Sequence, residues 1–169
     1  FGDFELHVDW RIKETNGLYP IPVVLSDGSF KKDQQVEVIR NPTPNADSGI
    51  LLRGKMKAQC NIWCWPVGSG EVYGYRMDQS MPPEVRAAVT PSRRADKPVG
   101  EWNTFIITMQ GDRLTVNLNG QTVIENAQLP GVPTEGPIGF QHHGGKDKDG
   151  NYNMSASLVQ FRNVFIKEL

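Results

Sequence analysis

Hydrophobic and polar residues alternate along much of this chain. In the opening segment, 4–12, an apolar side chain recurs at every second position, and polar or charged side chains fill the positions between. The apolar series begins with Phe4, Leu6, Val8 and Trp10. A period of two residues is typical of a strand with one face in the core and the other in water. The opening segment therefore predicts a half-buried antiparallel strand.

The same pattern predicts several further strands. Residues 103–126 are interpreted as three successive strands with turns at 111–112 and 119–120, and Asn119-Gly120 is the dipeptide favoured by a two-residue type I′ hairpin. Two more strands are expected at 136–144 and 157–169. The prolines of 80–102 leave room only for a short helical turn around Glu84 to Ala88. We therefore expect an all-β sandwich of two antiparallel sheets.

Length and charge limit the number of domains and the kinds of partner that this chain can have. With 169 residues, of which 38% are hydrophobic, the chain suits a single domain over 1–169. The 18 basic residues nearly balance the 19 acidic ones, which argues against a nucleic-acid partner. No apolar run reaches membrane-spanning length, so we expect no membrane insertion. The oligomeric state stays open.

The densest aromatic stretch of the chain, 60–76, also contains both cysteines. Cys60 and Cys64 are four positions apart, which in a strand corresponds to roughly 13 Å, beyond the ~7 Å limit for bridged α-carbons. Two free thiols are expected, and the spacing gives no zinc site. If 59–65 is a strand, Cys60, Ile62 and Cys64 lie on its core face.

The other face of this expected strand mixes amides and indoles. It holds Gln59, Asn61, Trp63 and Trp65. Such a face suits a sugar, whose C–H groups stack on aromatic rings and whose hydroxyls pair with amides. Tryptophans that fill the layer between the sheets are the alternative.

The residues that follow, 68–76, are expected to continue in a strand. In that strand Glu71, Tyr73 and Tyr75 would lie on one side and Val72 and Arg76 on the other. Glu71 follows a glycine-rich turn, where a chain can approach a ligand closely, and is a candidate catalytic residue. A solvated glutamate is the alternative.

Six short motifs follow one another along the chain. They are SGILLRG (48–54), GSGEVYGYR (68–76), GEWNTF (100–105), LTVNLNGQTVIEN (114–126), GPIGFQHHG (136–144) and VQFRNVFIKEL (159–169). In order and spacing they resemble the 3-keto-disaccharide hydrolase family, over the whole chain from Phe1 to Leu169. The resemblance implies a concanavalin A-like jelly roll. It also implies a secreted or periplasmic bacterial glycoside hydrolase whose substrate sugar is oxidised at carbon 3.

The resemblance also assigns roles to individual residues. It places the family's arginine at Arg53, and the glutamine and histidine of its Q-x-H-G strand at Gln141 and His143. Gln59 stands where many family members have an acid. Residues 17–45 are interpreted as an insertion.

The chemistry implied for a 3-keto sugar fits these residues. No Glu-x-Asp-x-x-Glu pattern of a retaining glycosidase is present. A ketone acidifies the neighbouring C2 hydrogen, so elimination and hydration need one base, one acid and a group that stabilises the enolate. Either Glu71 or His143 could be the base, the other could protonate the leaving oxygen, and Arg53 is the candidate stabiliser. The candidate substrate contacts are Asn61, Trp63, Trp65, Tyr73 and Gln141.

Two other functions compete with this one. A non-catalytic carbohydrate-binding jelly-roll module would use the same aromatic face, and an adhesion domain would bury Trp63 and Trp65 away from any cleft. No cofactor is predicted. The segment DKDGN at 147–151 is similar to the start of a calcium loop but lacks its closing glutamate, so a turn is the favoured interpretation, with a divalent metal such as calcium left open.

Overall fold

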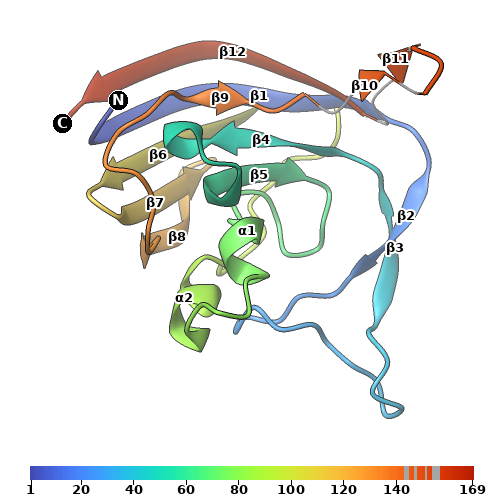
Figure 1. The fold of residues 1–169 in the computed structure, drawn as a ribbon. Helices are drawn as coiled ribbons and strands as arrows, with labels where there is room; N and C mark the ends of the chain where they lie inside the picture. The colour runs from blue at the N-terminus through green and yellow to red at the C-terminus, as the bar shows by residue number, and fades with distance from the viewer. Residues whose placement is uncertain (143–144, 147, 151, 154–156) are drawn as a thin grey trace.

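The computed structural model describes residues 1–142, 145–146, 148–150, 152–153 and 157–169. Its strands and helices follow one another along the chain as Figure 1 shows. In order they are β1 (Phe4–Thr15), β2 (Leu18–Pro22), β3 (Arg40–Pro44), β4 (Asp47–Leu51), the 3₁₀ helices η1 (Leu52–Gly54) and η2 (Met56–Ala58), β5 (Gln59–Trp63), α1 (Tyr73–Arg76), α2 (Pro83–Ala88), β6 (Asn103–Gln110), β7 (Arg113–Leu118), β8 (Gln121–Gln128), β9 (Gly139–Phe140), β10 (Gly145–Lys146), β11 (Tyr152–Asn153) and β12 (Ser157–Glu168).

Two antiparallel sheets form a sandwich. The larger sheet has five strands in the order β12-β1-β6-β7-β8, and the smaller has three in the order β5-β4-β9. One cluster of buried apolar side chains fills the layer between them, with Phe4 and Phe105 from the larger sheet and Ile50 and Ile62 from the smaller. This arrangement confirms the expected concanavalin A-like jelly roll.

Most of the strands that the alternation predicted are present, whereas in the described part of 136–144 only β9 (Gly139–Phe140) is a strand. Along β1, Phe4, Leu6, Val8 and Trp10 are each at most 1% exposed, while the residues between them are partly exposed. The three strands β6, β7 and β8 follow as expected. Asn119 and Gly120 join the last two with φ values of 53° and 81°, the left-handed pair that a type I′ turn requires.

The helices are short: α1 lies beside β5 of the smaller sheet, and α2 contacts β8 of the larger sheet. Helix α2 covers the short turn expected around Glu84 to Ala88. Prolines precede it and occupy its first position, where a missing N–H costs nothing. In the described part of the chain, no helix is long and apolar enough to cross a membrane.

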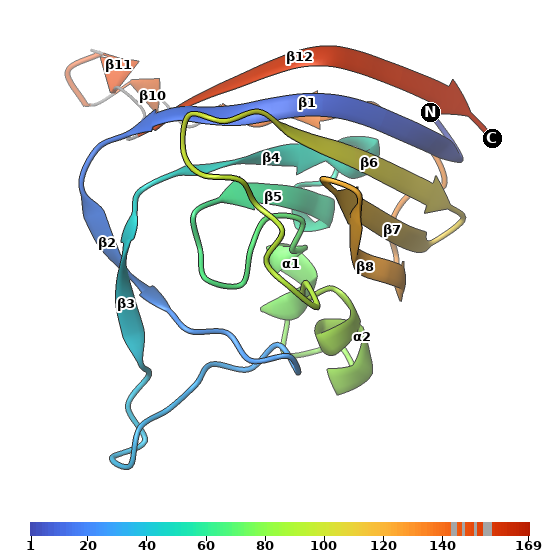
Figure 2. The same ribbon diagram turned by 180° about the vertical axis from the view of Figure 1, so that it is seen from behind.

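Residues 17–45, interpreted as an insertion, form an arm outside the sandwich. Its β2 and β3 pair only with each other, as a two-stranded ribbon. The register sets Pro20 opposite Pro42, with Leu18 opposite Pro44 at one end. Figure 2 shows the arm running away from the two sheets and returning toward α1 and α2. We call residues 17–45 the arm.

Both cysteines are free thiols in the core, as predicted. Cys60 and Cys64 belong to the buried apolar cluster. Burial raises the pKa of both thiols, so they remain protonated and unreactive at neutral pH.

Candidate functional site

The segment after β5 folds back along that strand and places Glu71 against it. The backbone N–H of Asn61 donates to the Glu71 carbonyl at 2.9 Å, and the Gly70 N–H donates to the Asn61 carbonyl at 2.8 Å. Gly68 and Gly70 make the reversal possible, because their φ values of 93° and 101° are left-handed. The Asn61 side-chain amide also donates to the Glu71 carbonyl, at 3.2 Å. Asn61, expected to contact sugar, is therefore engaged in positioning Glu71.

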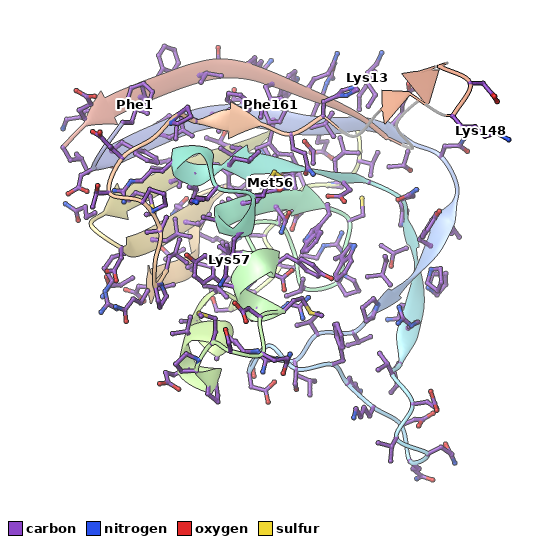
Figure 3. All side chains as sticks on the ribbon, viewed as in Figure 1. Phe1, Lys13, Met56, Lys57, Lys148 and Phe161 are labelled. Atoms are coloured by element: carbon purple, nitrogen blue, oxygen red, sulfur yellow. The ribbon has the colours of Figure 1, made fainter. Side chains whose placement is uncertain are left out.

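Residues 73–76 form helix α1, so the prediction of a continuing strand there is wrong. Gly74 lies so close to η2 that a Cβ atom at this position would be 2.7 Å from the Lys57 Cα atom. Figure 3 shows Lys57 beside α1. The helix places Tyr73 and Arg76 three residues apart on one side, where side chains can meet.

Glu71 and Arg76 form a buried ion pair. Arg76 Nε donates to Glu71 Oε1, and the exposure of both residues is 0%. The guanidinium also donates from Nη1 to the Gly28 carbonyl of the arm at 3.3 Å. Its Cζ lies 5.2 Å from the centre of the Tyr73 ring and 5.1 Å from that of Phe30. Two atoms of the pair, Glu71 Oε2 and Arg76 Nη2, are buried and have no hydrogen-bond partner.

Burial controls the protonation of Glu71. Loss of water raises the pKa of this carboxyl to about 7, although the adjacent Arg76 guanidinium acts in the opposite direction. A carboxyl with such a pKa can accept or donate a proton near neutral pH, as general acid–base catalysis requires. Arg76 was not among the predicted site residues, because a strand would have pointed it away from Glu71.

Three aromatic rings, Trp63, Trp65 and Tyr73, form a cluster that we call the aromatic trio. The two indoles stack at 4.2 Å with an interplanar angle of 8°, and Tyr73 meets both edge-on at 6.0 and 5.9 Å. Trp63 is buried, and its Nε1 donates to the Gly68 carbonyl at 2.8 Å. Tyr73 is 38% exposed, and Trp65 is partly exposed. The surface available for stacking is thus Trp65 and Tyr73, with Trp63 as support.

The expected strand 59–65 is shorter than predicted, which explains this geometry. Strand β5 ends at Trp63, so Trp65 folds back over Trp63 and does not follow it along the same face. Both faces of β5 are buried, and the chain that returns after it pairs with its free edge. The prediction of an open platform on one face of this strand is therefore wrong for Trp63, and Trp65 and Tyr73 lie at the rim instead.

Two glutamine side chains, Gln59 and Gln141, are hydrogen-bonded to each other on the outer face of the smaller sheet. Gln59 Nε2 donates to Gln141 Oε1 and, at 3.3 Å, to the Ser48 carbonyl. Gln141 also accepts from Ser48 Oγ at 2.8 Å through its backbone carbonyl. The amides reach each other across Gly49 of β4, whose missing side chain leaves the space. Gln141 is half-buried, so its amide is ordered by Gln59 but still reaches the surface.

Gly49→Ala is expected to lower the free energy of unfolding by about 1–3 kcal/mol, because an added Cβ overpacks this face. That Cβ would lie 2.7 Å from Gln59 Cγ and 2.8 Å from the Cys60 carbonyl oxygen. Urea unfolding measures the change. Gly139→Ala is the matched control, since its Cβ would meet Leu51 Cβ at an ordinary 3.5 Å. Equal stabilities for the two variants would contradict the prediction.

Arg53 lies in a different place from Glu71. Its donors are occupied by the carbonyls of Gly2, Gly111 and Pro133 at 2.6–3.0 Å, and Nη2 also meets Asp3 Oδ1 at 3.0 Å. The residue is 3% exposed. No donor remains for a substrate ketone, so this geometry supports a structural role for Arg53.

The remaining predicted site residue, His143, lies outside the described residues, as do Asp147 and Asn151 of the proposed calcium-like turn. Among the residues that the structure does describe, no group of three or more His, Cys, Asp or Glu side chains is placed to hold a metal ion. Glu71, Arg76, Tyr73 and Trp65 are thus the described residues that the fold brings together.

The fold is an all-β sandwich of two antiparallel sheets in which Trp65 and Tyr73 lie near the buried Glu71–Arg76 pair. The chain belongs to the family described as the 3-keto-alpha-glucoside-1,2-lyase-like domain, whose pattern matches residues 1–167. This confirms the family expected from the six motifs. Comparison with curated proteins gives no significant match.

Two solved structures share the fold. Both are named as a "putative glycosyl hydrolase" from Parabacteroides distasonis ATCC 8503. The first is 21% identical with a TM-score of 0.53, and the match covers 100% of this chain and 79% of that one. The second is 18% identical with a TM-score of 0.50, covering 100% and 73%. These values support the shared sandwich architecture.

Proposed function

We propose that this protein cleaves 3-keto-glycosides by elimination followed by hydration, with Glu71 as the proton-transferring group. The observation that carries the proposal is the Glu71 carboxyl, which has an unpartnered oxygen, a pKa near neutrality and an aromatic surface beside it. The family description supports the reaction class.

The proposed reaction balances without an oxidant or a reductant. A base removes the C2 proton, which the C3 ketone acidifies, and the resulting enolate expels the glycosidic oxygen from C1 as a C1=C2 double bond forms. A proton then passes to the leaving oxygen. Water adds across the double bond, with hydroxyl to C1 and hydrogen to C2, and the 3-keto sugar is released. The net result is hydrolysis.

Glu71 is proposed as the base. Arg76 replaces Arg53 as the proposed stabiliser of enolate charge, because its Nη2 has no partner while the donors of Arg53 are occupied. A guanidinium in a site that excludes water is suited to this role. His143 remains the proposed acid on the strength of the family resemblance.

The substrate would be held at the rim of the site. Trp65 and Tyr73 present the partly exposed rings on which a sugar can stack. Gln141 contributes an amide for hydroxyl groups. Trp63 would position Trp65 by stacking on it, and Asn61 would position Glu71 through its hydrogen bond to the Glu71 carbonyl.

Glu71→Gln is expected to lower kcat on an aryl 3-keto-glucoside by about 10²–10⁴-fold, because an amide cannot accept the C2 proton. Gln retains an oxygen that can accept from Arg76, so the variant should fold, as circular dichroism would show. Since the base must be ionised, activity of the parent should rise with pH through about 7. Release of the aglycone measures both effects.

Glu84→Gln is the matched control, because Glu84 is an exposed carboxylate of α2. It should keep the parent rate. The parent glucoside without the ketone should not be cleaved. Turnover by a folded Glu71→Gln variant at the parent rate would refute the role of Glu71.

A non-catalytic binding function is the second candidate. Its specific support is that Glu71 is fully buried while Trp65 and Tyr73 reach the surface. A binding module would take up 3-keto and unoxidised glycosides in calorimetry without releasing an aglycone from either. Whether the protein is an enzyme or a binding module, Trp65→Ala should weaken sugar binding by about tenfold, since the sugar would lose the aromatic ring on which it stacks, and stacked rings contribute about 0.5–1.5 kcal/mol.

A further inference from the structure

The arm covers the Glu71–Arg76 pair. Two of its residues touch the guanidinium: Gly28 accepts from Arg76 Nη1 at 3.3 Å, and the Phe30 ring lies over the Arg76 Cζ at 5.1 Å. Both belong to a tight turn, 25–30. On the other side, Tyr73 and the body of α1 complete the enclosure. The pair is therefore enclosed between the sandwich and a segment outside both sheets.

The covering turn is held together mainly by its own hydrogen bonds. The Leu25 N–H donates to the Ser29 carbonyl at 2.8 Å, and the Gly28 N–H donates to the Leu25 carbonyl at 2.9 Å. Asp27 Oδ1 accepts from both the N–H and the hydroxyl of Ser29. Because these hydrogen bonds lie within the turn, the turn can move as a unit without breaking them.

The turn approaches α1 and α2 closely at Gly28. A Cβ atom at Gly28 would lie 3.0 Å from the Arg86 carbonyl oxygen and 3.1 Å from both Arg76 Cγ and Thr90 Oγ1. Gly28 also has a left-handed φ of 80°. Glycine lets the turn settle onto α1 and α2 by close approach, without a side chain that would anchor it.

The ribbon of the arm has no ladder pairing with the sandwich, and of its residues only Pro22 and Thr43 are buried. Its β2 and β3 pair with each other and with neither sheet of the sandwich, and a two-stranded ribbon is at best marginally stable alone. Leu18 and Tyr19 near its base are 65% and 55% exposed, so they do not pack it against the body.

With the turn closed, two polar atoms beneath it have no hydrogen-bond partner. Glu71 Oε2 and Arg76 Nη2 are buried without partners, which is unfavourable because each atom has lost its hydrogen bonds to water. Opening the turn would hydrate these atoms, and a polyhydroxylated ligand would supply partners for them. The closed state is thus disfavoured at the place where a ligand would act.

We infer that the turn 25–30 is a movable cover that opens to admit a glycoside to Glu71 and Arg76 and closes over the bound sugar. The inference rests on the proposed function of this site. Gly28 and Phe30 act through Arg76 and are positioning residues.

Gly28→Ala tests whether the turn must settle over Arg76. A Cβ atom at this position would lie 3.0 Å from the Arg86 carbonyl oxygen, so the turn could not close fully. Gly17→Ala is the matched control, because Gly17 lies in the same arm with a similar left-handed φ of 78° but has open space at its Cβ position. Phenylglyoxal modification of Arg76, followed by peptide mapping with the exposed Arg93 as internal reference, reports opening independently of catalysis.

Gly28→Ala should speed modification of Arg76 severalfold and lower turnover, and Gly17→Ala should match the parent in both. Equal modification of Arg76 in the two folded variants would overturn the inference of a cover. Faster modification in Gly28→Ala, without turnover of the 3-keto-glycoside by the parent or either variant, would retain the cover and reject the proposed function.

Phe30→Ala tests the same inference at a second residue of the turn. Loss of the ring over Arg76 should speed its modification severalfold and leave that of Arg93 unchanged. An unchanged rate at Arg76 in a folded Phe30→Ala variant would count against the cover.

Discussion

Arg53→Met is expected to lower the free energy of unfolding by about 4 kcal/mol, since each hydrogen bond from a charged donor contributes about 1.5–3 kcal/mol. Three carbonyls, those of Gly2, Gly111 and Pro133, depend on this guanidinium. They come from distant parts of the chain, so the arginine joins the start of β1, the turn between β6 and β7, and the segment before β9. For a chain of this length the loss corresponds to about 8–16 °C in Tm.

Arg113→Met is the matched control for Arg53. The Arg113 side chain is 47% exposed and lies 3.7 Å from Asp112, so its removal should change stability by less than about 0.5 kcal/mol. Urea unfolding monitored by tryptophan fluorescence measures both variants. If Arg53→Met lost less than about 1 kcal/mol, water would have to replace the missing donors, and the structural role assigned to Arg53 would be wrong.

The second large effect is expected at the buried ion pair. Arg76→Met leaves the Glu71 carboxyl without its cation, and Glu71→Leu leaves the guanidinium alone. Each single variant should lose about 3–5 kcal/mol, because an uncompensated buried charge is costly. The double variant should recover most of this loss, because two apolar side chains then fill the space. A double-mutant cycle by urea unfolding measures the coupling between the two residues.

The pH dependence supplies an independent check on the pair. Burial raises the pKa of Glu71 from its ordinary 4.5 to about 7, so between these values the folded protein holds a proton that the unfolded chain has lost. The stability that this bound proton on Glu71 contributes is therefore full below pH 4.5 and is lost as the pH rises through 7. This fall should be absent in the double variant. Additive single losses, or an unchanged pH profile, would contradict the coupling.

The sequence predicted the elements whose pattern is local. Alternation along β1 and the Asn119-Gly120 turn do not depend on distant contacts, so both are found as expected. Helix α1 could not be predicted in this way, because its course depends on the approach of Gly74 to the Lys57 backbone. The strand period assigned to 68–76 therefore failed.

The site was predicted in part for the same reason. Glu71 and the aromatic residues were identified from their chemistry, but the helix that turns Arg76 toward Glu71 is a tertiary effect. Arg53 could not be assigned correctly from its motif, because its carbonyl partners lie at residues 2, 111 and 133. Nor does any sequence period indicate that the arm returns to cover the pair.

The prolines of the arm limit how strands of other molecules can pair with the edges of the ribbon. Since Pro20 faces Pro42 across the ribbon and neither has an N–H, this pair cannot exchange ladder hydrogen bonds, and its nitrogens face outward. The positions in phase with it on the two edges include Pro22 and Pro44 as well. A strand from another chain would find few donors there with which to extend the sheet. The ribbon can therefore expose Leu18 and Tyr19 while resisting edge-to-edge aggregation.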